Sequence, residues 1–342
     1  VTKMVWRRWP VNVKALIRTI NHTLKSHNLF PENSRILVAC SGGPDSMALL
    51  YLLQDIATHR HTTYKIGVAI VDHCIRPESK DEVLWLQHQV EELGLPFYSA
   101  TFDVPRLSKE HKKSEETIGR QVRYQWLNEI AQSEGYDYIS VAHHKDDQAE
   151  SILAHLIRGT GLNGLTGMAV VSNDYDVPVI RPLLDVTKEE LLAYLADRKL
   201  TYCIDSTNDD IRYQRNKIRH RVIPELESIN PNVVDAIARL GGSVSEDLAV
   251  ISDLTVQAFK RLVTIDKGEM RLSRRALRKE PLAIQRRLWQ SLVSSIDSDI
   301  TLTTAHQEQL LDIVNTGEAK TFTIKSIKVI AQCDTIKVYC KH

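Results

Sequence analysis

The stretch Val38-Ala39-Cys40-Ser41-Gly42-Gly43-Pro44-Asp45-Ser46-Met47 decides the fold of the first half of this chain. It follows the apolar residues 36–38 and precedes an apolar helical pattern over residues 47–53. The order strand, glycine turn, helix places backbone N–H groups at a helix start, where the helix dipole favours an anion. The two glycines let the backbone approach a ligand closely. We therefore expect an anion-binding turn here.

The side chains of this turn suit a phosphate ligand. The hydroxyl groups of Ser41 and Ser46 can donate hydrogen bonds, and Asp45 can hold Mg²⁺ against phosphate oxygens. No lysine follows the second glycine, so the turn is not the G-x-x-x-x-G-K-[ST] loop of common nucleoside triphosphatases. The alternative is a plain glycine turn between a buried strand and a helix. The spacing of Ser, Asp and Ser around the glycines argues against that alternative.

Short apolar segments alternate with amphipathic helical patterns through the first half of the chain. The expected strands are 35–39, 65–71, 97–102, 136–142 and 177–180, and the expected helices are 46–57, 78–93, 114–133, 145–158 and 187–198. This alternation predicts an α/β fold with a doubly wound parallel sheet that is covered on both faces. Ligands in such folds bind beyond the carboxyl ends of the strands. The glycine turn, Asp72-His73 and His143-His144 all follow expected strands.

The alternation stops near Asn208, and the pattern becomes helical and charged from Arg212. We expect a long helix over 232–264, shorter helices over 273–279, 282–294 and 303–316, and short strands within 320–341. The predicted architecture is therefore a first domain over residues 1–215 and a mostly helical second domain over 216–342 with a short β end.

Composition excludes several classes of protein. The 342 residues are 43% hydrophobic and 25% charged with a net charge of +1, which is ordinary for a soluble globular protein. The five cysteines form no C-x-x-C pair, which disfavours a zinc site, an iron–sulfur cluster or a disulfide framework. No apolar segment has the length of a membrane span, and the first 28 residues lack a signal-peptide core. We expect a cytoplasmic protein.

The segment 142–150, AHHKDDQAE, gathers imidazoles and carboxylates after an expected strand. A transition-metal site is one interpretation, but zinc usually requires a third ligand at a defined spacing such as H-E-x-x-H. N-capping by Asp146 is a second interpretation. We favour a helix start at which Asp147 shares a magnesium ion with Asp45, while His144 contacts phosphate. Both aspartates begin helices at the same edge of the expected sheet.

Three groups of cations are candidate anion contacts. Arg120 and Arg123 share one helical face, where they can clamp phosphates or equally well pair with acids. A second helical face suits phosphate or carboxylate recognition, or is simply solvated; it carries Arg212, Arg215, Asn216 and Arg219. Between residues 260 and 287, ten lysines and arginines, Arg274 and Arg275 among them, face three acids. This patch suits a polyanion or forms a solvated face.

The string Ser41–Ser46 resembles the pyrophosphate loop of the N-type ATP pyrophosphatases, which split ATP into AMP and pyrophosphate and leave an adenylated intermediate. Taken together, the segments closely resemble the bacterial tRNA(Ile) lysidine synthetases over about residues 33–224. Small departures are Cys74 for a usual Gly, Ser151 for Thr and Thr207 for Ser. The matching segments are 41–46, 71–73, 143–150, 159–165, 180–184, 205–208 and 215–219.

The resemblance implies a C–N bond-forming ligase with ATP and Mg²⁺ as cofactors. Its RNA partner is a tRNA(Ile) with a CAU anticodon, whose wobble cytidine is adenylated and then attacked by free L-lysine to give lysidine. It implies no membrane and no obligate protein partner. Residues 1–215 become the catalytic domain and 216–342 the tRNA-binding domain.

The resemblance also assigns roles to individual residues. Nucleotide binding falls to Ser41, Gly42, Gly43, Pro44, Asp45, Ser46, Asp72 and His73. Magnesium falls to Asp45 and Asp147, which with His144 and Arg120 are the expected catalytic residues. Contacts with tRNA or the intermediate fall to Arg212, Arg215, Asn216, Arg219, Arg274 and Arg275.

Two other functions stay open. A cytidine thiolase of the same superfamily generally needs paired cysteines, which this sequence lacks. A non-catalytic tRNA-binding relative would not need Asp45, Asp147 and the two serines of the turn. The presence of these residues argues against this function.

Overall fold

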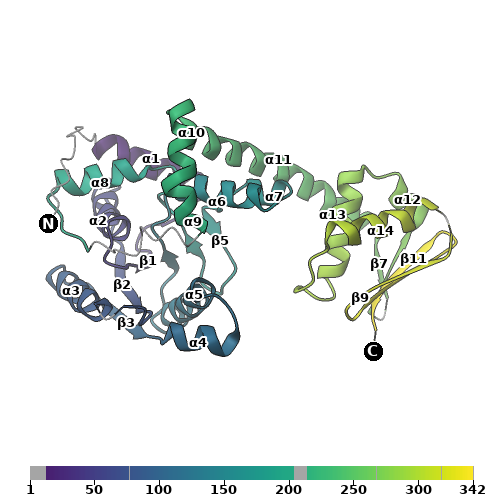
Figure 1. Cartoon of the computed structure of the whole chain (residues 1–342), viewed down its shortest axis with the longest axis horizontal. Coiled ribbons are helices and arrows are strands. Elements are labelled where there is room, and N and C mark those ends of the chain that lie inside the picture. Colours follow the sequence, from purple (N-terminus) through teal and green to yellow (C-terminus); the bar gives the residue numbers. More distant parts are fainter. Residues whose placement is uncertain (1–12, 77, 204–213, 267, 317, 342) are drawn as a thin grey trace. The chain divides into compact units, whose positions relative to one another are not determined.

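A computed structural model describes residues 13–76, 78–203, 214–266, 268–316 and 318–341 of the chain (Figure 1). The chain divides into two compact units, Val1–Gly242 and Ser243–His342. The division falls within helix α11 (Val233–Leu262), later in the chain than the boundary at residue 215 that the change of pattern predicts. One reason is that the start of α11 packs on the first unit, where Lys145 and Asp235 form an ion pair of 2.7 Å.

The first unit contains a sheet of the order β3-β2-β1-β4-β6-β5. Neighbouring strands are parallel except β5, which is antiparallel to β6. Ile36 and Val38 of β1 face one hydrophobic cluster and Leu37 faces another, because side chains alternate along a strand. The strands are β1 (Arg35–Ala39), β2 (Lys65–Asp72), β3 (Phe97–Thr101), β4 (Tyr138–Ser140), β5 (Val171–Ser172) and β6 (Val179–Ile180).

Helices cover both faces of this sheet, so the predicted doubly wound α/β class is confirmed. Figure 1 shows α2 and α3 on one side of strands β1–β3 and α5 on the other. The helices are α1 (Val13–Ser26), α2 (Pro44–His59), α3 (Ser79–Glu92), α4 (Val104–His111), α5 (Glu115–Ser133), α6 (Lys145–Ile157), α7 (Leu162–Leu165), α8 (Lys188–Asp197), α9 (Gln214–Lys217), the π-helix η2 (Ile218–Val222) and α10 (Ile223–Ile229).

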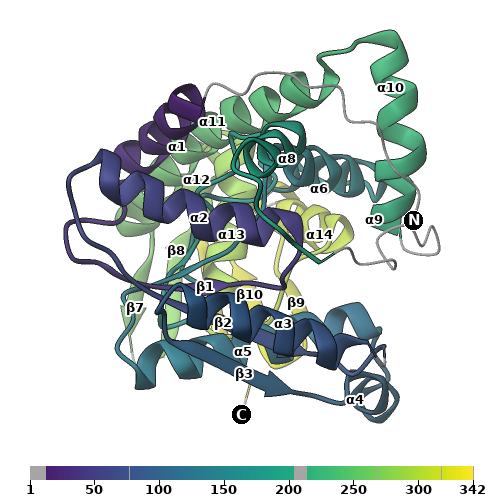
Figure 2. The ribbon, with the colours of Figure 1, turned by 90° about the vertical axis from the view of Figure 1, so that its left-hand side faces the viewer.

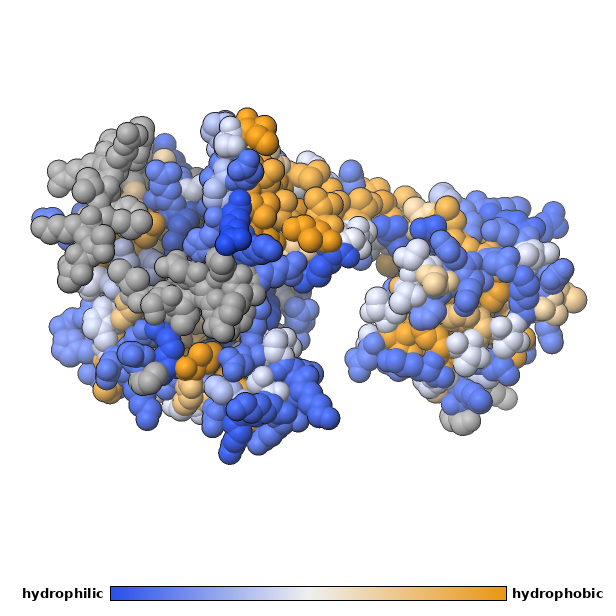
Figure 3. Space-filling view, in the orientation of Figure 1, coloured by the Kyte–Doolittle hydropathy of each residue, from blue (hydrophilic) through white to orange (hydrophobic). Residues whose placement is uncertain are grey.

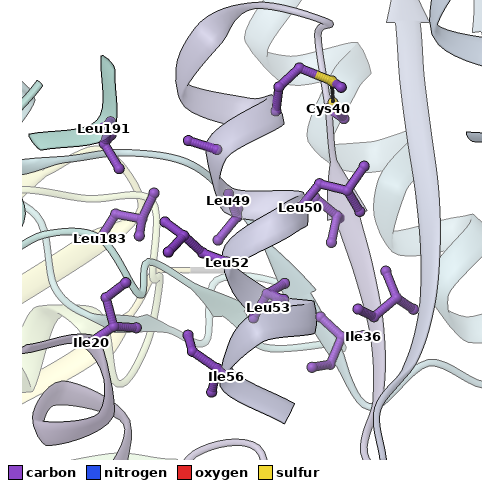
Figure 4. Close-up of a cluster of buried hydrophobic side chains, with 14 of the residues drawn as sticks. Ile20, Ile36, Cys40, Leu49, Leu50, Leu52, Leu53, Ile56, Leu183 and Leu191 are labelled. Atoms are coloured by element: carbon purple, nitrogen blue, oxygen red, sulfur yellow. Dashed lines mark hydrogen bonds between the residues drawn. The ribbon is translucent and has the colours of Figure 1, made fainter. Parts of the chain in front are cut away.

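Helix α2 is the centre of the larger core cluster. Figures 1 and 2 both show α2 between α8 and β1, and its leucines are buried on all sides. In Figure 4, Leu50 lies on the side of α2 that faces β1 and Ile36, whereas Leu52 lies on the opposite side, toward Leu183. This burial holds the N-terminal turn of α2, and with it the glycine turn, in a fixed place. Truncating one such leucine to alanine costs about 2–5 kcal/mol.

Some of the expected elements differ in extent. The expected strand 136–142 is limited to Tyr138–Ser140, and the helix α4 was not expected from the pattern. No helix in the described part of the chain is long and apolar enough to cross a membrane.

Apolar surface lies beside α10 in Figure 3. The exposed apolar side chains of this unit include Leu156, Ile157, Leu162, Ile229 and Leu240.

The second unit packs helices against an antiparallel sheet of the order β7-β8-β11-β10-β9. Trp289 and Leu288 of α13 are fully buried in its core. The expected helices and C-terminal strands are present, but β7 and β8 were missed, because the expected long helix was extended to Thr264 and the alternation in β8 covers only five residues. The elements are α12 (Arg274–Arg278), α13 (Leu282–Ser294), α14 (Thr304–Thr316), β7 (Thr264–Asp266), β8 (Glu269–Ser273), β9 (Lys320–Ile324), β10 (Ile327–Gln332) and β11 (Thr335–Cys340).

Candidate functional site

The glycine turn between β1 and α2 is held open by its own hydrogen bonds. Gly42 has a φ of +77°, a left-handed conformation that favours glycine. The hydroxyl of Ser46 accepts from the N–H of Ser41 at 3.2 Å and donates to the carbonyl of Gly43 at 3.0 Å. Pro44 occupies the first turn of α2, where its missing N–H costs nothing. The turn is therefore preformed, with the N-terminus of α2 at its mouth.

His144, the N-cap residue of α6, lies among three carboxylates. Its Nε2 is 3.7 Å from Oδ2 of Asp45 and 3.5 Å from Oδ2 of Asp147, and its Nδ1 is 3.4 Å from Oδ2 of Asp146. These are ion-pair distances, longer than ordinary hydrogen bonds. Burial opposes the charged imidazole, but Asp146 and Asp45 outweigh it and raise the pKa of His144 to about 9. The side chain is therefore a buried cation at neutral pH.

Asp45 has a second cationic neighbour, which the sequence analysis did not single out. Lys188 Nζ lies 2.5 Å from Oδ1 and 2.6 Å from Oδ2 of Asp45. Burial works to raise the pKa of Asp45, yet His144 and Lys188 together lower it. The only signal in the sequence is the position of Lys188 directly after Thr187, which caps α8.

A buried acid pair on α6 receives two arginines from the segment after residue 213. Arg215 donates from Nε to Glu150 and from Nη2 to Asp147, both at 2.7 Å. Arg219 donates from Nε to Glu150 at 2.6 Å and from Nη2 to Asp147 at 3.1 Å. Asp147 keeps a pKa of about 2, because His144 and Arg215 outweigh the effect of burial. Arg219 lies in the π-helix η2, and π-helical segments are frequent at functional sites.

His143 is a neutral imidazole beside these charges. Burial, and then Arg181, Arg215 and Arg120, lower the pKa of His143 to about 3, although Asp147 acts in the opposite direction. Its Nδ1 is buried without a hydrogen-bond partner in the described residues. Arg120 is exposed, with its guanidinium 4.6 Å from the centre of the Tyr124 ring. It approaches the site from α5.

Asp72 is the last residue of β2 and His73 follows the strand, which ends one residue later than expected. Asp72 is buried and accepts from the N–H of Cys74 at 2.9 Å. Burial and Arg123 lower the pKa of His73 to about 4. The His73 ring packs close to Gly119, where a side chain would meet it.

Most of the predicted site residues in the first unit therefore meet at one edge of the sheet. Asp45, His144 and Asp147 are in contact through the His144 imidazole, and Arg215 and Arg219 join them. Asn216 follows Arg215 on α9. Residues 204–213, and with them Arg212, lie outside the described residues. Sequence reasoning gave no role to Glu150 or Arg181, although both lie within the segments that it matched.

Of the two expected magnesium ligands, Asp45 is better placed to bind a metal ion than Asp147. Within the described ranges, no three His, Cys, Asp or Glu side chains form a metal-binding group. Mg²⁺ at phosphate sites is commonly held by only one or two carboxylates plus the phosphates. Asp45 fits this description, because its carboxylate is partly exposed and both of its oxygens contact Lys188, whose side chain is also partly exposed. Both oxygens of Asp147 are already engaged, by Arg215 and by the N–H of His144, so its role as a ligand stays a prediction.

The basic patch of the second unit is smaller than its composition indicates. Arg274 is buried and donates to the carbonyl of Glu318 at 2.6 Å, so the structure does not support its predicted contact with tRNA. Arg271 pairs with Glu269, and Arg261 pairs with Glu280 at 2.5 Å. Arg275 is exposed at the start of α12, and its contact with tRNA stays a prediction.

The PP-loop domain family matches residues 13–226 of the chain. The tRNA(Ile)-lysidine synthase of Porphyromonas gingivalis is 37% identical over 227 residues, which are 66% of this chain and 48% of that protein. The tRNA(Ile)-lysidine synthase of a Nostoc species is 33% identical over 313 residues, which are 86% of each chain. The chain belongs to the tRNA(Ile)-lysidine synthase family of PP-loop proteins.

Members of this family differ in length. The chain spans about half the length of the first curated relatives that it matches. A solved structure with a similar fold is the U34-tRNA thiolase NcsA from Methanococcus maripaludis with its [4Fe-4S] cluster. The two share a TM-score of 0.59 and 21% identity over 68% of this chain and 78% of that one, which supports the PP-loop fold alone.

Proposed function

We propose that this member of the tRNA(Ile)-lysidine synthase family catalyses the reaction for which the family is named. In the first step, the C2 carbonyl oxygen of the wobble cytidine in a CAU-anticodon tRNA(Ile) attacks the α-phosphorus of ATP, and pyrophosphate leaves. In the second step, the ε-amine of free L-lysine attacks C2, loses a proton and displaces AMP, giving lysidine. The anticodon loop is single-stranded, so exposing its base to a pocket costs little.

One observation carries the proposal. A preformed anion turn, a buried cationic histidine and two arginine–carboxylate pairs meet at the carboxyl edge of a PP-loop sheet. Such a site can bind a polyphosphate and a zwitterionic amino acid beside each other. Catalysis of both steps would then rest on positioning the reactants and on neutralising phosphate charge.

For the adenylation step, the residues at the turn act on the phosphates. Backbone N–H groups at the start of α2 and the hydroxyl of Ser41 would donate hydrogen bonds to the leaving pyrophosphate, and the positive charge of His144 would offset its negative charge. Asp45 would hold Mg²⁺, which when bound supplies further neutralisation of phosphate oxygens.

For the lysine step, the acid pair on α6 provides negative charge for the positively charged substrate. The carboxylates of Asp147 and Glu150 can receive an ammonium group if Arg215 and Arg219 turn toward the phosphate of the adenylate. His143, neutral and with Nδ1 unpartnered in the described residues, can hydrogen bond to base or amine without adding charge.

A pyrophosphate-release assay tests the function. The purified protein, ATP, Mg²⁺ and tRNA(Ile) transcript should release pyrophosphate, and lysidine should appear by mass spectrometry only when lysine is added. A transcript with uridine in place of the wobble cytidine is the matched control and should give neither product.

The alternatives give different results in the same assay. A thiolase would consume ATP with the tRNA but would place sulfur, not lysine, on the base. A non-catalytic tRNA-binding protein would bind the transcript and release no pyrophosphate. Either result would overturn the proposal.

A further inference from the structure

Three helices of the first unit begin at one place. Asp45 lies in the first turn of α2, His144 caps α6, and Lys188 is the first residue of α8. The contacts Asp45–Lys188 and Asp45–His144 join these starts, and Asp146 on α6 accepts from the backbone N–H of Lys188 at 2.8 Å. The positive ends of three helix dipoles therefore converge on Asp45.

Lys188 stands at an unfavourable position for a cation. A positive side chain in the first turn of a helix opposes the helix dipole, and here a second and third dipole end add to that cost. The His144 imidazole lies 3.7 Å from Oδ2 of the same carboxylate. Asp45 is thus the carboxylate from which the Lys188 ammonium receives its opposite charge, at a place where the three dipole ends favour an anion.

The backbone at Lys188 is fixed, while its side chain is not enclosed. The N–H of Lys188 is bound by Asp146, and Thr187 and Glu190 form a capping box around the start of α8. The Lys188 side chain is 34% exposed and that of Asp45 29% exposed. The ammonium can therefore change partners by rotation of its own side chain, without movement of the helix.

We propose that Lys188 alternates between two partners: it neutralises Asp45 in the metal-free protein, and it binds pyrophosphate oxygens once a divalent cation takes Asp45. The inference rests on the proposed function only in assuming that the turn receives the polyphosphate of a nucleotide. Lys188 then has two effects of opposite sign. It competes with a free divalent cation for Asp45, and it strengthens binding of a metal-bound pyrophosphate.

The test uses Lys188→Met, which keeps the length of the side chain and removes its charge. Binding of Mn²⁺ alone is titrated by electron paramagnetic resonance, and binding of inorganic pyrophosphate at saturating Mn²⁺ is titrated by calorimetry. Lys145→Met is the matched control, because Lys145 is also the first residue of a site helix but pairs with Asp235. Circular dichroism establishes that each variant is folded.

Lys188→Met should bind free Mn²⁺ about five- to tenfold more tightly and pyrophosphate about tenfold more weakly, as expected for loss of one partly exposed ion pair. Lys145→Met should change neither affinity by more than about twofold. In Asp45→Asn combined with Lys188→Met, the gain in Mn²⁺ affinity should disappear. A parallel loss of both affinities, or no change in either, would overturn the exchange of partners.

The result is separable from the fate of the proposed function. Neither titration needs tRNA, lysine or turnover. If the unaltered protein fails to bind pyrophosphate with Mn²⁺, the polyphosphate assignment of the turn is wrong. If it binds pyrophosphate and Lys188→Met behaves like the unaltered protein, only the role of Lys188 is wrong.

Discussion

Arg215 Nε lies 2.7 Å from Oε2 of Glu150, a side chain that is only 1% exposed. Arg219 reaches the other oxygen of the same carboxylate at 2.6 Å. A buried carboxylate without a partner is strongly destabilising, and the two guanidinium groups are the ion-pair partners of Glu150 in the interior. They also stand between the acid pair and solvent, since each arginine side chain remains more than a third exposed.

This arrangement predicts that Arg215→Ala lowers the catalytic rate more than the affinity for tRNA. Arg215 contacts Asp147 and Glu150 at the site, so its loss removes a cation beside the adenylate and disturbs both acids. We expect single-turnover adenylation at saturating tRNA to slow by about 10²-fold, with tRNA affinity changed only a few-fold. Arg219→Ala should behave similarly.

Arg221→Ala is the control for this pair, because Arg221 is an exposed arginine of the same π-helix. Its rate at saturating tRNA should equal that of the unaltered protein. An unchanged rate for Arg215→Ala together with weaker tRNA binding would assign this face to docking instead of catalysis.

The role of Asp45 predicts a different pattern. Asp45→Asn keeps the size of the side chain but removes the charge that would hold Mg²⁺. We expect lysine-independent adenylation of tRNA to be abolished and tRNA affinity to stay within a few-fold. Adenylation at a near-normal rate would show that Asp45 is not the metal ligand.

His73 predicts a pH dependence of stability. Its folded-state pKa of about 4 lies below the ordinary value of 6.5, so the unfolded chain binds the proton more readily. The contribution of His73 to stability is therefore complete above pH 6.5 and is lost as the pH falls toward 4. The loss is no more than about 3 kcal/mol, and less after solvent screening of this incompletely buried group.

Chemical denaturation of the protein and of His73→Gln between pH 4 and pH 7 measures this effect. The variant should lose less stability over that interval than the unaltered protein. Identical slopes would mean that His73 does not carry the depressed pKa.

The glycine turn and the strand ends could be predicted because local sequence determines them. The segment around Gly42 contains its own strand, turn and helix signals, and His144 with Asp147 follows a strand that must end at the same sheet edge. Contacts across long distances in the chain could not be predicted in this way. Lys188 and Asp45 are separated by 143 positions, and no pattern in either segment indicates that the two residues are in contact.

The burial of charged side chains also could not be predicted from the sequence. Counting charges between residues 260 and 287 treats Arg274 and Arg275 alike, although one is buried and the other is exposed. The difference arises from the register of α12, whose N-cap Ser273 and neighbour Asp334 fix which side faces the core. A charge pattern alone does not contain that register.

Arg274 and Arg275 therefore predict opposite outcomes for two adjacent substitutions. Arg275→Ala should weaken tRNA binding and reduce the slope of log affinity against log salt by about one. The reason is that binding with one phosphate contact fewer releases fewer counterions from the tRNA. Arg274→Ala should leave that slope unchanged and destabilise the second unit by about 1–3 kcal/mol, since it removes a buried hydrogen bond to Glu318. Filter binding at several salt concentrations and thermal unfolding measure the two effects. If Arg275→Ala leaves the salt slope intact, α12 is a solvated face and tRNA binds elsewhere.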